Sequence, residues 1–237
     1  MRLSMPISKS DSMSFTNALF FEGDNDLYPV GHLIDLLPGP GTDFYERTPE
    51  ERGNLIGLKA FGGYDPLRRQ FPVAIRSGST LERIGIVADA NSNPVRRWQS
   101  LTDAMPGINT VDLPDTPPGG GWTDNLELPD REVTVGLWMM PNNADQGAVE
   151  DFLLRLIPED DSLLPIAEAC LEEVPNEDQP DHSKALVRTW LAWQEEPGRP
   201  LGPAVTEGYF DLETDLARRF VNWIRRLFPA RGDPIQE

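Results

Sequence analysis

The stretch Ala18-Leu19-Phe20-Phe21-Glu22-Gly23-Asp24-Asn25-Asp26 decides how the fold of this chain is interpreted. Its apolar residues are too few for a helix, and they end directly on the carboxylate of Glu22. A glycine and an acidic turn follow, and an amphipathic helix is predicted to begin near Asp26. This pattern is typical of a buried parallel strand that leads into a helix. Ligands of such folds bind at the carboxyl ends of the strands, so Glu22 and Asp26 are well placed to hold a cation.

The residues that follow alternate between strand and helix patterns. The strands are predicted at 18–22, 54–60, 83–89 and 133–140, and the helices at 25–37, 65–76, 94–105 and 147–157. This alternation indicates an α/β fold with a mostly parallel central sheet flanked by helices, in which the first and third strands are adjacent. Shorter strands are predicted at 111–113 and 122–128. Pro72 is expected to kink or shorten its helix.

Composition divides the chain into four parts. Residues 1–16 are polar and serine-rich and are expected to form a flexible leader, and residues 230–237 a flexible tail. Residues 17–158 hold the alternating strands and helices and form the α/β core. Residues 159–229 are predicted to be a helical C-terminal extension packed on this core, with a loop around 197–203. Three tryptophans of this extension are expected to lie in the core: Trp190, Trp193 and Trp223.

The composition also limits what the chain can bind. The formal charge of its 237 residues is −18, whereas a protein that grips nucleic acid through phosphates usually has a basic excess. Any contact with nucleic acid is therefore expected to be local, bridged by a metal ion or supplied by a partner. The single cysteine, Cys170, excludes an internal disulfide and a four-cysteine zinc site. There is no apolar run of transmembrane length and no signal-peptide core, so a cytoplasmic protein without membrane contact is expected.

Polar side chains follow the predicted strands at the points where these end. The residues concerned are Glu22, Asp26, Asp89, Asn91, Glu150 and Asp151. All of them offer hard oxygen donors, which suit magnesium or manganese rather than zinc. Several carboxylates around one point also repel one another unless a cation lies between them. A site for Mg²⁺ or Mn²⁺ is therefore predicted at the edge of the sheet.

Some of these acids also have an ordinary structural explanation. Acidic side chains are favoured in the first turn of a helix, which accounts for Asp26, Glu150 and Asp151 without a metal ion. Glu22 and Asp89 instead end strands. Glu22 is not needed as a helix cap, because the acidic turn after it already offers side chains for that purpose.

The two strand-end motifs resemble those of the Toprim domain, which occurs in topoisomerases, primases and the overcoming-lysogenisation-defect (OLD) family of nucleases. Glu22-Gly23-x-x-Asp26 after an apolar strand is similar to the first Toprim motif. Asp89-Ala90-Asn91 occupies the place of the second motif, which is Asp-x-Asp. The resemblance implies the Toprim fold for the α/β core.

Three further segments resemble a stand-alone Toprim-like family that is often found beside ABC-type ATPases in phage-defence contexts. These segments are Gly136–Asn143, Val149–Leu153 and the pair Lys184-Ala185, which precedes a tryptophan-rich helix. What this implies is a magnesium-dependent nuclease that hydrolyses the phosphodiester bonds of DNA or RNA, with an ABC-type ATPase as its partner. Assembly into an oligomer is compatible with such a role.

The resemblance also implies roles for single residues. Glu22 and Asp26 would share metal ligation and general-base work, and Lys184 would stabilise the charge that develops on a phosphate. Glu22 and Lys184 are therefore the expected catalytic residues. The metal site implied by the motifs comprises Glu22, Asp26, Asp89, Asn91, Glu150 and Asp151.

One departure from the Toprim pattern keeps a second interpretation open. Asn91 stands where the motif has its second acid, so one negative charge is missing and metal affinity should fall. Asn91 could also be a turn residue. The alternative to a nuclease is therefore a Toprim-like subunit with a weakened metal site, which binds or regulates an ATPase assembly without cutting nucleic acid.

Arginine pairs occur on the predicted helix surfaces at 68–69, 96–97 and 225–226. The first two pairs could face phosphates. Solvation on a helix surface is the common alternative for such pairs.

Overall fold

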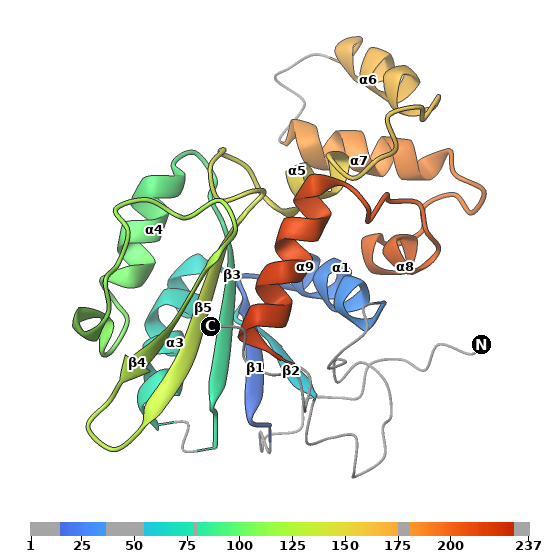
Figure 1. Ribbon diagram of the computed structural model, residues 1–237. Helices are drawn as coiled ribbons and strands as arrows, with labels where there is room; N and C mark the ends of the chain where they lie inside the picture. The colour runs from blue at the N-terminus through green and yellow to red at the C-terminus, as the bar shows by residue number, and fades with distance from the viewer. Residues whose placement is uncertain (1–14, 37–54, 78–79, 175–180, 230–237) are drawn as a thin grey trace.

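The centre of the molecule is a five-stranded sheet with the strand order β2-β1-β3-β5-β4 (Figure 1). The computed structural model describes residues 15–36, 55–77, 80–174 and 181–229, so the expected tail and nearly all of the expected leader lie outside the described residues. The strands are β1 (Asn17–Phe21), β2 (Ile56–Ala60), β3 (Arg83–Asp89), β4 (Trp122–Glu127) and β5 (Glu132–Met140). Only β4 runs antiparallel to its neighbour. The predicted mostly parallel α/β sheet is confirmed, as is the pairing of the first and third strands.

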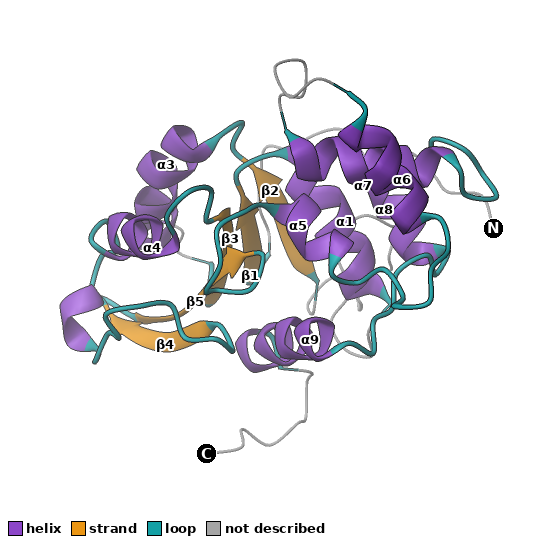
Figure 2. Cartoon of the chain, turned by 90° about the horizontal axis from the view of Figure 1, so that it is seen from above, coloured by secondary structure: helices purple, strands orange, loops and turns teal. Residues whose placement is uncertain are grey.

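The side chains of β1 alternate between two hydrophobic clusters, one on each face of the sheet. Ala18 and Phe20 belong to the cluster under α3 (Tyr64–Ser77) and α4 (Pro94–Thr102). Leu19 and Phe21 belong to the cluster on the opposite face, which α1 (Asp24–Asp35) and α9 (Asp215–Leu227) share. Figure 2 shows these two layers from above, with α3 and α4 on one side of the strands and α9 on the other. The buried strand β1 thus separates two cores, as its continuous apolar sequence requires.

The remaining helices gather beside α1 and complete the second cluster (Figure 1). They are α5 (Val149–Leu154), α6 (Leu164–Glu172), α7 (His182–Ala192) and α8 (Leu201–Thr206). A short 3-10 turn, η1 (Ile108–Thr110), precedes β4. No helix among the described residues has the length and apolar character needed to cross a membrane.

Helix α9 lies directly on the sheet because two paired glycines make room for it. Gly85 of β3 and Gly136 of β5 are aligned in the sheet. A Cβ atom added to Gly136 would lie 2.7 Å from Leu227, and one added to Gly85 would lie 2.9 Å from the same side chain. Trp223, one turn earlier, is fully buried and donates a hydrogen bond to the carbonyl of Trp122 at 3.0 Å. The end of the helical extension is therefore part of the layer that covers the sheet.

Four local predictions differ from the structure. Residues 111–113 form no strand, and of the loop predicted around 197–203 only residues 197–200 are irregular, because α8 begins at Leu201. Pro200 and Pro203 lie at the N-cap and in the first turn of α8, where the N–H groups that prolines lack would have no partner in the helix. Helix α3 covers the whole predicted range 65–76, so Pro72 does not shorten it. Trp193 is 41% exposed, whereas Trp190 and Trp223 are buried as expected.

Candidate metal centre

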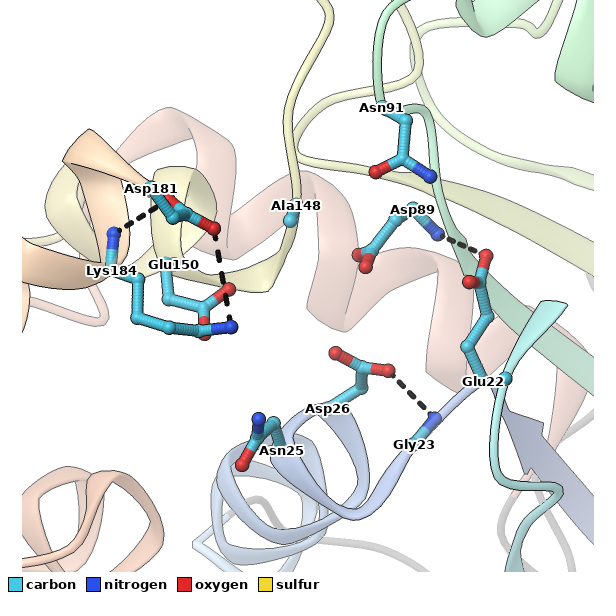
Figure 3. A pocket seen from close by; sticks show the side chains of 11 residues that line it. Glu22, Gly23, Asn25, Asp26, Asp89, Asn91, Ala148, Glu150, Asp181 and Lys184 are labelled. Carbon is cyan, nitrogen blue, oxygen red and sulfur yellow. Dashed lines mark hydrogen bonds and ion pairs between the residues drawn. The ribbon is translucent and has the colours of Figure 1, made fainter. Parts of the chain in front are cut away.

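A polar pocket of about 270 Å³ opens at the edge of the sheet where β1 and β3 end. Helices α1 and α5 begin at its wall, and α7 contributes its first turn (Figure 3). Eleven residues line it: Glu22, Gly23, Asn25, Asp26, Gly63, Asp89, Asn91, Ala148, Glu150, Asp181 and Lys184. The pocket therefore joins the ends of parallel strands to the starts of helices, which is where ligands bind in open α/β sheets.

Glu22 and Asp89 lie side by side because β1 and β3 are hydrogen-bonded neighbours. The register pairs Phe21, the last residue of β1, with Val87, and β3 runs two residues further to Asp89. An oxygen of Glu22, Oε1, accepts a hydrogen bond from the backbone N–H of Asp89 at 3.0 Å. Only 9% of Glu22 is exposed. The strand pairing itself thus fixes both carboxylates at one end of the pocket.

Asp26 is the third carboxylate, and it also has a structural task. Its Oδ2 accepts a hydrogen bond from the backbone N–H of Gly23 at 3.0 Å, at the start of α1. This one-way cap satisfies a backbone donor that the helix itself cannot. Asp26 is only 6% exposed, and Figure 3 shows its side chain pointing toward the same open space as those of Asp89 and Glu150. The capping bond leaves its other oxygen for a ligand.

Burial and mutual repulsion favour the protonated forms of these acids. The pKa of Asp89 is raised to about 9, first by burial and then by the charges of Asp26, Glu22 and Glu150. Burial likewise raises the pKa of Asp26 to about 7, to which Glu22 and Glu150 contribute by repulsion. The pKa of Glu22 is also raised by burial, although Arg97 and the hydrogen bond from Asp89 oppose this. The surroundings therefore do not neutralise the negative charge that full ionisation of these acids would place in the pocket.

The opposite wall of the pocket carries a carboxylate with a fixed countercharge. Glu150, in the first turn of α5, is 3% exposed, and its Oε1 lies 3.6 Å from Nζ of Lys184. Lys184 lies 4.0 Å from Asp181, whose side chain caps α7 by accepting a hydrogen bond from the backbone of Lys184 at 3.0 Å. The first turn of α7 thus holds Lys184 against Glu150.

Two backbone contacts hold the loops around the pocket. Gly63 donates its N–H to the carbonyl of Glu22 at 2.6 Å with φ at +133°, a conformation that a side chain would strain. Asn91 and Gly147 exchange two backbone hydrogen bonds of 2.8 Å each. This bridge ties the turn after β3 to the loop before α5, so the two walls of the pocket are connected.

The family model described as "Protein of unknown function (DUF3226)" matches residues 16–229, which include the whole sheet and every residue that lines the pocket. The chain belongs to the DUF3226 family. No curated protein and no solved structure matches it.

In this DUF3226 chain, the pocket brings together six of the seven residues singled out from the sequence. They are Glu22, Asp26, Asp89, Asn91, Glu150 and Lys184. Asp151 does not join them. One of its oxygens accepts a hydrogen bond from the backbone of Ala148 at 2.8 Å, and the other accepts one from the hydroxyl of Ser183 at 2.5 Å. The geometry gives Asp151 the task of capping α5 and tying it to α7.

Sequence reasoning missed Asp181, which lines the pocket next to Lys184. Its position three residues before Lys184, at the start of a helical pattern, marks it as an N-cap. That signal predicts the cap, but it does not reveal that the cap faces a pocket.

The DUF3226 pocket has the chemistry of a site for a hard cation. Asp89 Oδ1 is buried without a hydrogen-bond partner among the described residues, and such atoms usually have one. Glu150 Oε1 also lacks a hydrogen bond there and has only the ion-pair contact with Lys184 at 3.6 Å. Within the described residues, no three or more Asp, Glu, His or Cys side chains stand in a ready-made metal-binding arrangement. The donor types and the unsatisfied oxygens fit Mg²⁺ or Mn²⁺, with water completing the shell. The side chains would have to rearrange for their oxygens to reach one ion.

Proposed function

We propose that this chain is a metal-dependent phosphodiesterase that acts on nucleic acid, in the manner of a Toprim nuclease. The observation that carries the proposal is the meeting of four carboxylates, from Glu22, Asp26, Asp89 and Glu150, with Lys184 in one pocket at the strand ends. The resemblance of the motifs at Glu22 and Asp89 to Toprim motifs supports it. The proposed activity is assigned to the cytoplasm, as expected from the sequence.

Asp26, Asp89 and Glu150 would hold the ion, and Asn91 would add an amide oxygen. A bound Mg²⁺ in such a site lowers the pKa of water and neutralises charge on a phosphate. Glu22, whose pKa is raised above the ordinary value of a glutamate, is suited to accept a proton from the attacking water. Lys184 Nζ, 46% exposed at the side-chain level, would face the negative charge that develops on the phosphate oxygens.

The test is cleavage of labelled single- and double-stranded DNA and RNA by the purified chain, with Mg²⁺, with Mn²⁺ and with EDTA. We expect cleavage in either metal that Glu22→Gln abolishes, since glutamine can still accept the bond from Asp89 but cannot take a proton. Asp24→Asn is the matched control, because Asp24 is exposed one residue beyond the pocket-lining Gly23. Equal activity of Glu22→Gln and the wild type would refute the proposal.

A second function, binding without cleavage, is favoured by Asn91 and by the formal charge of −18. In this case the chain would serve an ABC-type ATPase assembly as a regulatory subunit. Calorimetry separates the two, because the second function predicts that no divalent ion binds with an affinity that depends on Asp89. Nuclease activity that appears only when such an ATPase is added would support the first function and identify the partner as the supplier of substrate.

A further inference from the structure

Arg97 of α4 stacks on an aromatic ring at the border of the pocket. Its guanidinium carbon lies 3.5 Å from the centroid of the Tyr64 ring. Tyr64 is the first residue of α3 and directly follows Gly63, which lines the pocket. A guanidinium stacked on an aromatic face is held in one plane, and it keeps its N–H donors at the edge of that plane.

The charge of Arg97 acts on the carboxylates of the sheet edge. It lowers the pKa of both Glu22 and Asp89, against the effect of burial. No hydrogen bond or ion pair joins Arg97 to a carboxylate within the described residues. Arg97 is therefore near enough to act on the carboxylates through its charge, while its donors remain uncommitted.

Lys184, across the pocket, differs from Arg97 because its charge is already paired with carboxylates. It is paired with Glu150 and Asp181, at 3.6 and 4.0 Å. Lys184 approaches from α7 and Arg97 from α4, on the other face of the sheet. An anion drawn to a metal ion at the carboxylates would therefore meet a second, unpaired cation on the α4 side.

We infer that Arg97 binds a backbone phosphate of the nucleic-acid strand at the border of the pocket, and that Tyr64 holds its guanidinium in the orientation this requires. The inference rests on the proposed function, because it takes a phosphodiester substrate at the neighbouring carboxylates. Arg97 is a positioning residue for the strand. Its planar donors match phosphate geometry, which the single ammonium group of a lysine does not.

The test measures binding of fluorescent 20-nucleotide single-stranded DNA and RNA to the full chain in Ca²⁺, at NaCl concentrations from 20 to 200 mM. Arg97→Ala should weaken binding by about tenfold and lower the slope of log affinity against log salt by about 0.7, the share of one phosphate contact on a single strand. In Mg²⁺ the same change should raise KM more than it lowers kcat. Arg97→Lys should recover part of the affinity.

Arg96→Ala is the matched control, because it removes the same charge from the neighbouring position of α4, where the side chain is exposed. It should leave the salt slope unchanged. Tyr64→Phe, which keeps the ring, should bind like the wild type, and Tyr64→Leu should bind like Arg97→Ala. Thermal unfolding of every variant identifies changes that act only through stability.

The outcomes separate this inference from the proposed function. Cleavage that needs Glu22, with a salt slope and KM unaltered by Arg97→Ala, would overturn the role of Arg97 alone. Equal losses for Arg96→Ala and Arg97→Ala would also overturn it, since they would show a general effect of charge. If the wild type bound no DNA or RNA at 20 mM NaCl, the role of Arg97 would also be overturned. Binding that depends on Arg97, without metal-dependent cleavage, would instead refute the proposed nuclease function and support the contact between Arg97 and a phosphate.

Discussion

The two walls of the pocket hold their carboxylates by different means. On the sheet side, Glu22 and Asp89 are fixed by the pairing of β1 and β3 and by a backbone hydrogen bond, and no cation pairs with them among the described residues. On the helical side, Glu150 is paired with Lys184 across α5 and α7. On the sheet side, ionised carboxylates would repel one another until a cation binds between them. On the helical side, Lys184 already balances the charge of Glu150. Four predictions test this contrast.

The largest effect is expected from Asp89→Asn. The pKa of Asp89 is raised the most in this cluster, so folding must either keep a proton on this carboxyl group or bury its charge. Asparagine removes this cost, and the metal-free protein should therefore become more stable. The same change should also weaken Mg²⁺ binding and cleavage by more than about 100-fold, beyond the usual effect of residues that only support metal ligands. Calorimetry and thermal unfolding with and without Mg²⁺ measure both quantities, with Asp24→Asn as control. Loss of stability in the metal-free variant would contradict the contrast.

The second prediction concerns pH. The folded chain keeps protons on Asp26 up to about pH 7 and on Asp89 up to about pH 9, while the unfolded chain releases them near pH 4. The folded state therefore binds more protons between about pH 4 and pH 9, and the free energy of unfolding should fall as pH rises through that window, by on the order of 1 kcal/mol per pH unit.

Thermal unfolding without metal from pH 5 to pH 9 checks this slope. Asp89→Asn should flatten it, and Mg²⁺ should bind more tightly and stabilise more at the alkaline end, because fewer protons then compete for the carboxylates. A profile that is equally steep in Asp89→Asn would assign the slope to the general acidity of the chain.

A third, smaller effect separates two neighbours on the helical side. Asp151→Asn should lower the free energy of unfolding by about 1–2 kcal/mol, since it weakens the bonds from Ala148 and Ser183 that involve a charged acceptor. Its Mg²⁺ affinity should stay that of the wild type. Glu150→Gln should do the opposite and weaken metal binding with little loss of stability. Denaturant unfolding measures the stability of the two variants, and calorimetry measures their Mg²⁺ affinity. A fall in metal affinity for Asp151→Asn would place Asp151 in the metal site.

The smallest effect is expected from Asn91→Asp. Asn91 has φ at +50°, which aspartate also tolerates, and its backbone bridge to Gly147 should survive. The added charge should raise Mg²⁺ affinity several-fold, on the order of 1 kcal/mol, and lower the melting temperature of the metal-free protein at pH 8. Unchanged affinity would show that Asn91 lies outside the metal shell, and the site could then not be called weakened on its account.

The strand ends are the part of the site that sequence alone could predict. An apolar run ending on an acid marks both Glu22 and Asp89, and the topology of parallel strands brings such ends to one edge. The fold class could also be predicted from the sequence, because a chain that alternates strands and helices can form few sheet topologies.

The helical side was less accessible to prediction because it depends on how helices are rotated. Glu150 and Asp151 are consecutive, so they point about 100° apart around α5. Which of them faces the pocket depends on the packing of Val149, Phe152 and Leu153 against distant elements. The same dependence applies to the pair 96–97, which the sequence marks as able to face phosphates without showing that Arg96 is exposed and Arg97 is partly buried.

The place of α9 on the sheet has a consequence for the order in which the molecule can be completed during synthesis. α9 follows every other described element in the chain, yet Leu227 fills the notch above Gly85 and Gly136 in the middle of the sheet. A ribosome-bound chain that stops short of residue 228 leaves this apolar face open, and exposed apolar surface of this kind promotes aggregation. Nascent chains of this protein should therefore depend on holding chaperones until α9 has emerged.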